Sequence, residues 1–455
     1  MNFSELESKK GSLRDVLESV IAESKKSGID NVEIFCSYVN GQEISLEKND
    51  INTSTSMEET TYGIRVIDSG CQGFVSTNDR DTLLQSVKDA RAIARSLNTP
   101  DAALALPEAA VITPVASACR KELDDTSFDD LLLSVQELLQ YKNSEFPKVN
   151  IDSGEFDITR GFKMIASSKG VYADESGGSV SGSFMGMAVD GPRVGGFDYD
   201  YATGHTLAEF QANIKPAFEK FLKQCMSTLD AQNIESFRGS LLLPPRIAAG
   251  FLLGDLLGSI TAPMIRKGKS RFGDKLHTRI ASELLTVTDN PRIDHYSATT
   301  SFDREGQPTR EMSILNGGVL ENYYYNFFES NKASVPFQGG FASGGAAALP
   351  SCGPRQIQIA AGNSALSDMT GRDNTILMHR FSGSTDASSG DFSGVVKGGF
   401  LLQNGKKTPV REIQIAGNIY EALNNISAVS SERELVHSSS MIPWIMLDNI
   451  DITGS

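Results

Sequence analysis

Apolar residues recur at helical spacing in four stretches of the first half of the chain. In residues 12–27, Leu13, Val16, Leu17 and Ile21 fall on one face of a helix, and a glycine follows as a stop signal. The same spacing predicts further helices over 82–97, 127–143 and 207–228. Pro216 lies inside the last of these and is expected to cap or kink it.

Apolar and polar residues alternate between these helices, which is the pattern of half-buried strands. Positions 32, 34, 36 and 38 are apolar, Asn40-Gly41 is a tight-turn dipeptide, and Ile44 and Leu46 continue the alternation. This combination predicts a β-hairpin that turns at Asn40-Gly41. Residues 156–189 alternate in the same way around glycine-rich turns, which indicates a meandering antiparallel sheet.

These patterns predict an α+β protein with three domains. A chain of 455 residues exceeds the roughly 250–300 at which a single core stops growing. Residues 98–116 are rich in Ala and Pro and are expected to form a linker. We therefore expect an N-terminal α+β domain (1–100), a middle α+β domain (101–235) and a β-rich C-terminal domain (236–455), with further Asn-Gly turns at Asn316-Gly317 and Asn404-Gly405.

Residues 245–260 form the most unusual predicted helix. It follows an apolar strand and a Pro-Pro break, and it carries Gly254, Asp255, Gly258 and Ser259 among leucines. Asp255 either lies on the polar face of an amphipathic helix or directs a carboxylate into a cleft. Ser259 has no nearby base, and the chain has neither a G-x-S-x-G elbow nor a phosphate-binding loop.

A second candidate region is the charged turn at 301–311. Charges this dense around a Gly-Gln-Pro turn are expected to be solvated. Alternatively, Arg310, with Glu311 beside it, contributes to substrate binding, because a guanidinium group binds a carboxylate through two hydrogen bonds. The glycine-rich segment 336–354 has no periodicity and predicts a long loop, which in compact domains is either functional or disordered.

Composition narrows the function classes. Lys and Arg number 42 and Asp and Glu 57, which gives a net charge of −15 and argues against nucleic-acid binding. An apolar N-terminal segment and long apolar runs are both missing, so we expect a cytoplasmic protein that does not enter membranes. The five cysteines form no CxxC pair and are expected to be reduced thiols; Cys352 is a candidate nucleophile. The five histidines are too far apart for two to share a helix, although a zinc site built from distant residues stays open.

Several segments, in this order, resemble the TldD/PmbA family, whose members were once called modulators of DNA gyrase. They are VEIFCSYVNGQEISLEKNDINTSTSMEETTYGIRVIDSGCQGFVSTND near the N-terminus, then LLTVTDNP, SFDREGQPTREMSILNGGVLENYYYN and TDASSGDFSGVVKGGFLLQNGKKTPVREIQIAGNIYEALNNISAV. Together these matches cover most of the chain. The acidic net charge fits the gyrase label poorly.

The resemblance implies a two-subunit metallopeptidase that acts on unfolded peptides. TldD-type subunits carry a helix with His-Glu, three residues and His, and a C-terminal cysteine completes the zinc site. Here Gly254 and Ser259 stand where the histidines would be, Asp255 replaces the glutamate, and the C-terminal run has no cysteine. The chain therefore resembles the PmbA (TldE) kind, which has no metal or catalytic residues of its own and pairs with a zinc-bearing TldD-like subunit. A peptide-binding or ligand-binding homodimer is the alternative.

Overall fold

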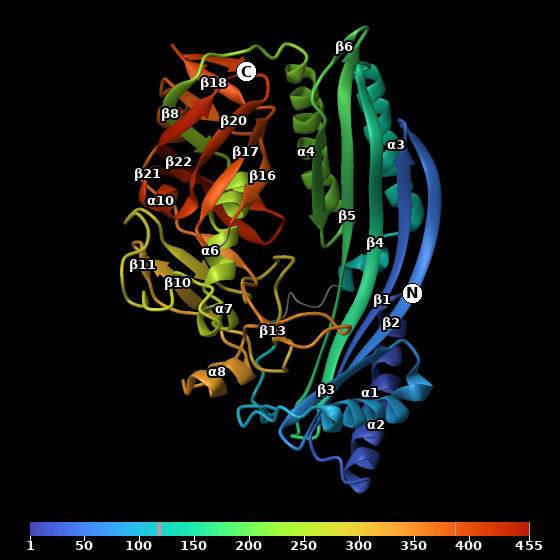
Figure 1. Cartoon of the computed structure of the whole chain (residues 1–455). Coiled ribbons are helices and arrows are strands. Elements are labelled where there is room, and N and C mark those ends of the chain that lie inside the picture. Colours follow the sequence, from blue (N-terminus) through green and yellow to red (C-terminus); the bar gives the residue numbers. More distant parts are fainter. Residues whose placement is uncertain (116–120, 387, 455) are drawn as a thin grey trace.

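Two halves of the molecule lie side by side, and both are built mainly from strands (Figure 1). The computed structural model describes residues 1–115, 121–386 and 388–454. The N-terminal half is a sheet domain with helices, and the C-terminal half is rich in strands, which confirms the predicted α+β class. Across the described residues, no helix is both long and apolar enough to cross a membrane.

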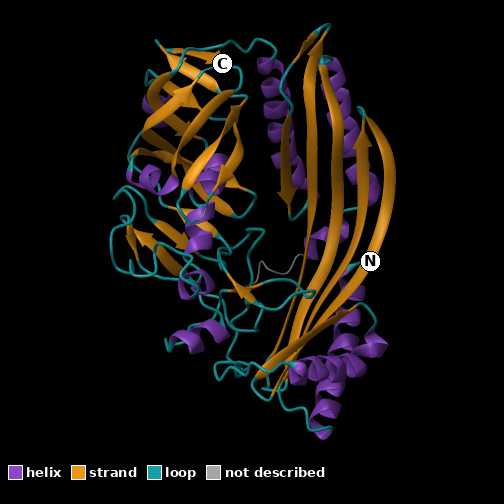
Figure 2. Cartoon of the chain, in the orientation of Figure 1, coloured by secondary structure: helices purple, strands orange, loops and turns teal. Residues whose placement is uncertain are grey.

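The N-terminal half is organised around one seven-stranded antiparallel sheet with strand order β3-β2-β1-β4-β5-β6, in which β7 also pairs with β5. Four of its strands are very long and curve together along the molecule (Figure 2). The elements are α1 (Phe3–Lys26), β1 (Val32–Glu47), β2 (Asp50–Asp68), β3 (Cys71–Thr77), α2 (Leu83–Ser96), α3 (Phe128–Glu145), β4 (Val149–Ser167), β5 (Tyr172–Asp190), β6 (Arg193–Val194), β7 (Asp198–Gly204) and α4 (Leu207–Thr228).

The predicted hairpin turn at Asn40-Gly41 is wrong. Strand β1 runs straight through both residues, and Gly41 pairs with Met57 on one side and Thr159 on the other. The chain reverses instead at Lys48 and Asn49, which both adopt the left-handed conformation (φ 53° and 71°) that a two-residue hairpin requires. The alternating apolar positions that suggested two strands, at 32, 34, 36, 38, 44 and 46, are all even-numbered, so they belong to one face of one uninterrupted strand.

All four long helices cover the same face of this sheet. Even-numbered residues of β1 pack with α1 and α2 at one end, and Ile44 and Leu46 pack with α3 and α4 at the other. The predicted helices over 82–97, 127–143 and 207–228 are confirmed, and α4 continues through Pro216. Strands on both sides of residue 100 join this one sheet, so the boundary between the first two domains stays a prediction.

The C-terminal half combines a nine-stranded sheet (order β16-β17-β20-β22-β8-β15-β18-β19, with β21 on β22) with a four-stranded sheet (β11-β10-β9-β14) and the pair β12-β13. Its elements are β8 (Phe237–Leu243), α5 (Pro245–Ile247), a π-helical turn (Ala248–Leu252), α6 (Gly254–Ser259), α7 (Ala262–Arg266), β9 (Val287–Asp289), β10 (Met312–Asn316), β11 (Val319–Leu320), α8 (Phe327–Ala333), β12 (Ala342–Ser343), β13 (Ser351–Cys352), β14 (Ile357–Ile359), α9 (Leu366–Thr370), β15 (Thr375–Leu377), β16 (Arg380–Thr385), β17 (Asp391–Lys397), β18 (Phe400–Gln403), β19 (Lys406–Pro409), β20 (Ile413–Asn418), α10 (Ile419–Asn424), β21 (Ile426–Val436) and β22 (Ser440–Thr453).

Two of the predicted Asn-Gly turns lie in this half. Asn404 and Gly405 form the turn between β18 and β19, both with positive φ, which confirms the prediction. Between β10 and β11 the turn residues are Gly317 and Gly318, so the reversal lies one residue later than predicted.

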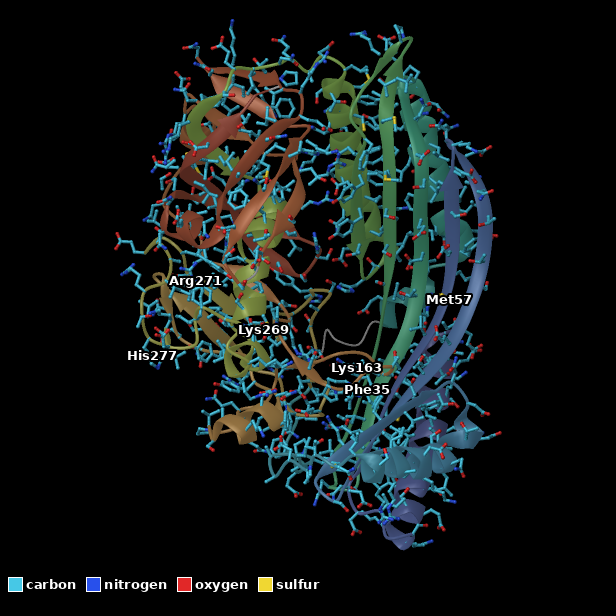
Figure 3. The ribbon with its side chains drawn as sticks, viewed as in Figure 1. Phe35, Met57, Lys163, Lys269, Arg271 and His277 are labelled. Atoms are coloured by element: carbon cyan, nitrogen blue, oxygen red, sulfur yellow. The ribbon has the colours of Figure 1, made fainter. Side chains whose placement is uncertain are left out.

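Near residue 300 the two halves meet on the sheet face opposite the helices. Phe35 and Lys163 of the sheet lie together at this junction (Figure 3). Phe35 packs with Ile165 and with Phe302 of the C-terminal half, and the Lys163 ammonium lies 4.7 Å from the centre of the Phe302 ring. Odd-numbered positions of β1 at this end of the sheet are therefore buried by the other half of the chain.

Candidate functional site

The segment 244–260 is a broken helix rather than the single helix that the sequence predicts. Pro244 and Pro245 start it, a π-helical turn occupies Ala248–Leu252, and α6 follows at Gly254–Ser259. Leucines at 252, 253, 256 and 257 are buried in the main C-terminal core. This burial fixes which side of the segment faces outward.

The outward side of the segment carries only glycine at three successive turns. Gly250, Gly254 and Gly258 are spaced four residues apart, so they lie on one face of the helix. All three are exposed, and a Cβ atom added at any of them would meet nothing within 4 Å. The backbone of α6 is therefore open to an approaching chain on this face.

Gly254 and Ser259 offer no pair of donor atoms to a metal ion. Gly254 is exposed and has no side chain, whereas Ser259 is buried and its hydroxyl lies 3.1 Å from the Tyr420 hydroxyl. These residues do not fit a zinc site, because one has no donor atom and the other faces the core. Within the described ranges, no group of three or more His, Cys, Asp or Glu side chains is arranged to hold a metal ion.

Asp255 is half-buried beside Tyr420. Burial raises the pKa of Tyr420, and the charge of Asp255 acts in the same direction. Asp255 thus lies at the edge of the core rather than on a fully solvated helix face. This position is intermediate between the two alternatives, a solvated polar face and a carboxylate directed into a cleft. Its proposed role stays a prediction.

The expectation that the turn at 301–311 is solvated is wrong for its first half. Asp303, Arg304 and Glu305 are each at most 2% exposed. Arg304 lies 3.0 Å from Glu33 of β1, and Arg65 of β2 bridges Glu33 (2.6 Å) and Glu305 (3.3 Å). The charges pair with the other half of the molecule, which the local sequence does not reveal.

These buried charges have strongly different environments. Burial raises the pKa of Glu305 to about 7, even though Arg65 opposes this shift. Burial acts in the same direction on Glu33, but Arg65 and Arg304 together hold the pKa of Glu33 below its usual value. One carboxylate of the network is thus firmly ionised, and the other titrates near neutral pH.

Asp303 anchors the glycine-rich segment 336–354 to this turn. Its carboxylate accepts backbone N–H groups from Glu305 and Gln307 within the turn, and from Gly340 and Ala342 within the glycine-rich segment. The predicted long loop therefore has fixed attachment points and also forms the short strands β12 and β13.

Arg310 and Glu311 are adjacent in sequence but differ in burial. The Arg310 Nε atom is buried without a hydrogen-bond partner among the described residues, and its guanidinium lies 5.3 Å from the centre of the Phe341 ring. Burial lowers the pKa of Arg310. Glu311 is exposed and accepts a hydrogen bond from the Asn290 side chain. Substrate binding by this pair stays a prediction.

The cysteines do not supply an obvious nucleophile. Cys36, Cys71, Cys225 and Cys352 are buried free thiols, and Cys119 lies outside the described residues. Burial raises the pKa of Cys352 to about 12, which disfavours the reactive thiolate at neutral pH.

A cleft lies between α4 and the nine-stranded sheet and is here called the interdomain cleft. It consists of three adjoining cavities of about 780, 530 and 440 Å³. The first and second share Gln224 and His379, and the second and third share Lys220 and Arg246. Figure 1 shows α4 facing the C-terminal half along this line.

Arg246 of α5 links the broken helix to this cleft. Its guanidinium lies 2.8 Å from the Asp200 carboxylate and packs against the rings of Tyr199 and Tyr201, all on β7. Neither this residue nor the others that line the cleft were predicted as site residues from the sequence. They come from segments far apart in the chain, so no local motif marks them.

Comparisons with known proteins agree with the geometry. Residues 237–454 match the family model for the PmbA/TldA metallopeptidase C-terminal domain, and residues 32–94 match that for PmbA/TldA metallopeptidase domain 1. A metalloprotease PmbA homolog of Haemophilus influenzae is 23% identical over 471 residues, covering 99% of this chain and 98% of that protein. The same organism also has a metalloprotease TldD homolog.

Two further relatives extend the comparison. A protein of Saccharolobus solfataricus named as a zinc metalloprotease TldD homolog is 24% identical over 224 residues, covering 46% of this chain and 50% of that protein. The crystal structure of TldE from Thermococcus kodakarensis superimposes with a TM-score of 0.87 at 21% identity, covering 96% of this chain and all of that one. By its sequence matches and its fold, this chain belongs to the TldD/PmbA family of metallopeptidases.

Proposed function

We propose that this chain is a metal-free PmbA (TldE)-type subunit of a TldD–TldE-like zinc metallopeptidase that degrades or processes unfolded peptides. The observation that carries the proposal is the segment 254–259, where glycine and a core-facing serine replace the ligands. The match to a PmbA homolog over almost the whole chain supports it, whereas the TldD relatives match less than half of the chain.

In this proposal the zinc ion and the catalytic base belong to a TldD-like subunit. This chain lines part of the substrate-binding chamber. The glycine face of α6 leaves room beside the backbone, and the interdomain cleft presents polar side chains to a peptide. Asp255 does not act as an acid or base, because a carboxylate without an adjacent metal or nucleophile has no reacting group to serve.

The direct test uses the full chain, alone and mixed with a TldD-like subunit that carries the His-Glu-x-x-x-His helix. Alone, the chain should contain no stoichiometric zinc by elemental analysis and should not cleave an unfolded casein substrate. The mixture should form a stable complex and cleave it. Tight zinc together with peptidase activity in the isolated chain would sink the proposal.

The second candidate function is a peptide-binding homodimer that works without a partner. The size of the interdomain cleft favours it, since cavities of roughly 300–1,000 Å³ are typical of ligand sites. Sedimentation of the purified chain separates the two ideas. A stable homodimer that does not bind an added TldD-like subunit supports this candidate function.

A further inference from the structure

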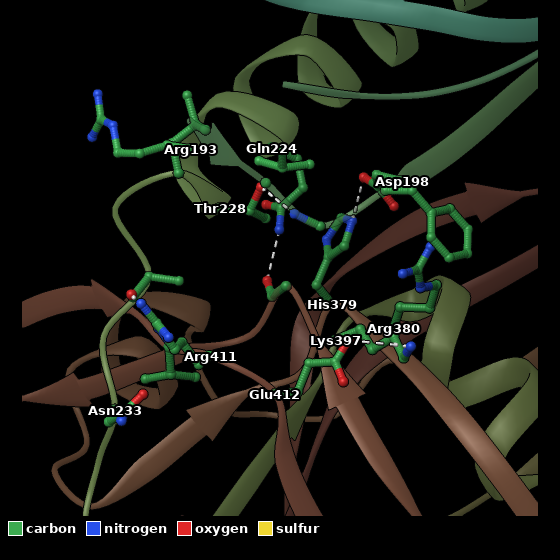
Figure 4. A pocket seen from close by; sticks show the side chains of 18 of the residues that line it. Arg193, Asp198, Gln224, Thr228, Asn233, His379, Arg380, Lys397, Arg411 and Glu412 are labelled. Carbon is green, nitrogen blue, oxygen red and sulfur yellow. Dashed lines mark hydrogen bonds and ion pairs between the residues drawn. The ribbon is translucent and has the colours of Figure 1, made fainter. Parts of the chain in front are cut away.

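The largest of the three cavities is distinguished by the basic side chains that line it (Figure 4). It holds about 780 Å³ between the β6–β7 connection, the end of α4 and the edge of the nine-stranded sheet. We propose that it binds an acidic peptide segment by its side-chain carboxylates, with Arg380 and Arg411 as the anchoring residues.

The charge of the cavity is opposite to that of the protein. The chain carries a net charge of −15, yet this cavity is lined by four Lys or Arg residues and only two carboxylates. Over the whole interdomain cleft, eight Lys or Arg residues stand against five Asp or Glu. Walls of low dielectric concentrate this positive potential inside the cleft, where it attracts anions.

Most charges in the cavity are already paired, and two are not. Asp198 is 2.8 Å from His379, and Glu412 is 3.2 Å from Lys397. In the part of the chain that the structure describes, neither Arg380 nor Arg411 forms an ion pair. The Nε atom of Arg411 donates only to the Ala231 carbonyl, at 3.3 Å.

Arg380 is held in place but lacks an acceptor. Its guanidinium stacks on the Phe197 ring, with 3.9 Å between the guanidinium carbon and the ring centre. The Nη1 atom is buried and has no hydrogen-bond partner among the described residues. A buried donor without an acceptor is costly, and a carboxylate would remove that cost by binding to the fork of the guanidinium.

The arrangement favours a peptide with several carboxylates over a single small anion. Arg380 and Arg411 lie on opposite sides of the cavity (Figure 4), so one compact anion does not bridge them. The exposed side chains of Val194 and Phe197 add apolar surface between the charges. The cavity also continues through Gln224 and His379 into the next one, so an extended chain has room to run along α4.

Lysines in the adjoining cavity continue the positive surface. Desolvation, together with the nearby charge of Lys220, lowers the pKa of Lys407. Two lysines that repel each other in this way gain stability when an anion lies between or beside them. The continuation supports recognition of a run of acidic residues rather than one.

This inference deepens the proposed function, because it names the class of peptide that a peptidase subunit would hold. It does not depend on catalysis, since binding is measured on this chain alone. Binding without restored peptidase activity would leave the inference standing and count against the proposed function. Restored activity without binding would do the reverse.

The test is isothermal titration calorimetry on the full chain with a blocked hexapeptide in which Glu and Ala alternate. The matched control peptide carries Gln in place of every Glu. The Glu peptide should bind about tenfold more tightly or better, and the preference should shrink at high salt. Equal binding of the two peptides would overturn the proposal.

The variants R380Q and R411Q locate the site. Each should weaken binding of the Glu peptide about fivefold to tenfold while circular dichroism stays unchanged. R380K keeps the charge but not the planar fork, so it should fall between wild type and R380Q. R238Q, which removes an exposed arginine of the same sheet outside the cavity, should leave binding unchanged.

Two other outcomes would contradict the assignment. If R380Q and R411Q bind the Glu peptide as well as wild type does, the peptide binds elsewhere. If inorganic phosphate binds and competes, but the Glu peptide does not bind at all, the cavity takes small anions and not acidic peptides.

Discussion

Glu305 is the single residue whose environment departs furthest from its local sequence. A Glu in a charged turn ordinarily stays solvated, but this one has a fully buried side chain and accepts a hydrogen bond from the Phe327 backbone. Arg65 lies close enough to stabilise its charge, yet burial prevails and raises its pKa to about 7. The carboxyl group is therefore poised to gain or lose a proton near neutral pH.

This shift predicts a pH dependence of stability. An unfolded Glu has a pKa of about 4.3, so between that value and about 7 the folded chain holds a proton that the unfolded chain has lost. The contribution of Glu305 is fully present at low pH and is lost as the pH rises through about 7. Glu305→Gln, which mimics the protonated form, should remove a decline on the order of 3 kcal/mol.

The measurement is the free energy of unfolding by urea at a series of pH values from about 4 to about 8, a range that spans the two pKa values. Glu311→Gln, a change at an exposed carboxylate in the same segment, is the control and should follow wild type. A wild-type slope retained in Glu305→Gln would show that Glu305 does not titrate in this range.

At the scale of elements, α6 packs one side against the core and carries glycines without side chains on its exposed side. Its leucines are buried, while Gly254 and Gly258 face open space. Glycine is the least favourable helix residue after proline, so its presence on this face costs stability. This cost in stability suggests that the absence of side chains on this face of α6 has a functional role.

Gly258→Ala should therefore stabilise the protein by about 0.5–1 kcal/mol. The added methyl group meets no atom within 4 Å and the backbone has an ordinary helical conformation. Gly73→Ala is the contrasting variant, because its Cβ would lie 1.8 Å from the Ala90 carbonyl oxygen. Thermal unfolding of the three proteins checks the order: Gly258→Ala highest, wild type between, Gly73→Ala lowest.

A bulky residue on the bare face should interfere with function but not with folding. Gly254→Trp should retain the wild-type melting temperature, since the position is exposed and unobstructed. If α6 lines a chamber shared with a TldD-like subunit, this variant should lower the peptidase activity of the mixture at least about tenfold. Gly11→Trp, at an exposed and equally open glycine of α1, is the matched control. Equal activity of the two Trp variants would place α6 outside the chamber.

At the scale of the whole molecule, the two halves are joined by different chemistry at two places. Near residue 300 an apolar cluster lies beside the buried Glu33–Arg65–Glu305 network. Along α4 the halves touch through separate polar contacts, such as Gln224 to the Gly398 carbonyl, around open cavities. The first junction therefore fixes the orientation of the halves, and the second leaves room for a ligand.

Arg65→Met should be strongly destabilising, by about 3–5 kcal/mol, because it leaves two buried carboxylates without their shared cation. Arg95→Met removes an arginine that is more than half exposed and pairs with Asp68, and it should cost less than about 1 kcal/mol. Urea unfolding followed by tryptophan fluorescence of Trp444 measures both. Equal effects of the two substitutions would mean that the buried network does not join the halves.

The sequence by itself determined the elements that depend on local periodicity. Helices such as α2 and α4, and the turn at Asn404-Gly405, follow from spacing and turn chemistry, and they occur as predicted. The family also follows from the sequence, because its motifs are contiguous. The hairpin turn predicted at Asn40-Gly41 is wrong, because this typical turn dipeptide lies in a strand that pairs with a neighbour on both sides.

Only the tertiary structure decided which charges are buried and which residues share a site. Glu33, Arg65 and Glu305 lie up to 272 positions apart in the numbering, yet their side chains form one network, because long-range strand packing brings them together. Arg380 and Arg411 join α4 and β7 at one cavity for the same reason. Burial and the pairing of distant charges are properties of the packed chain, and no local pattern encodes them.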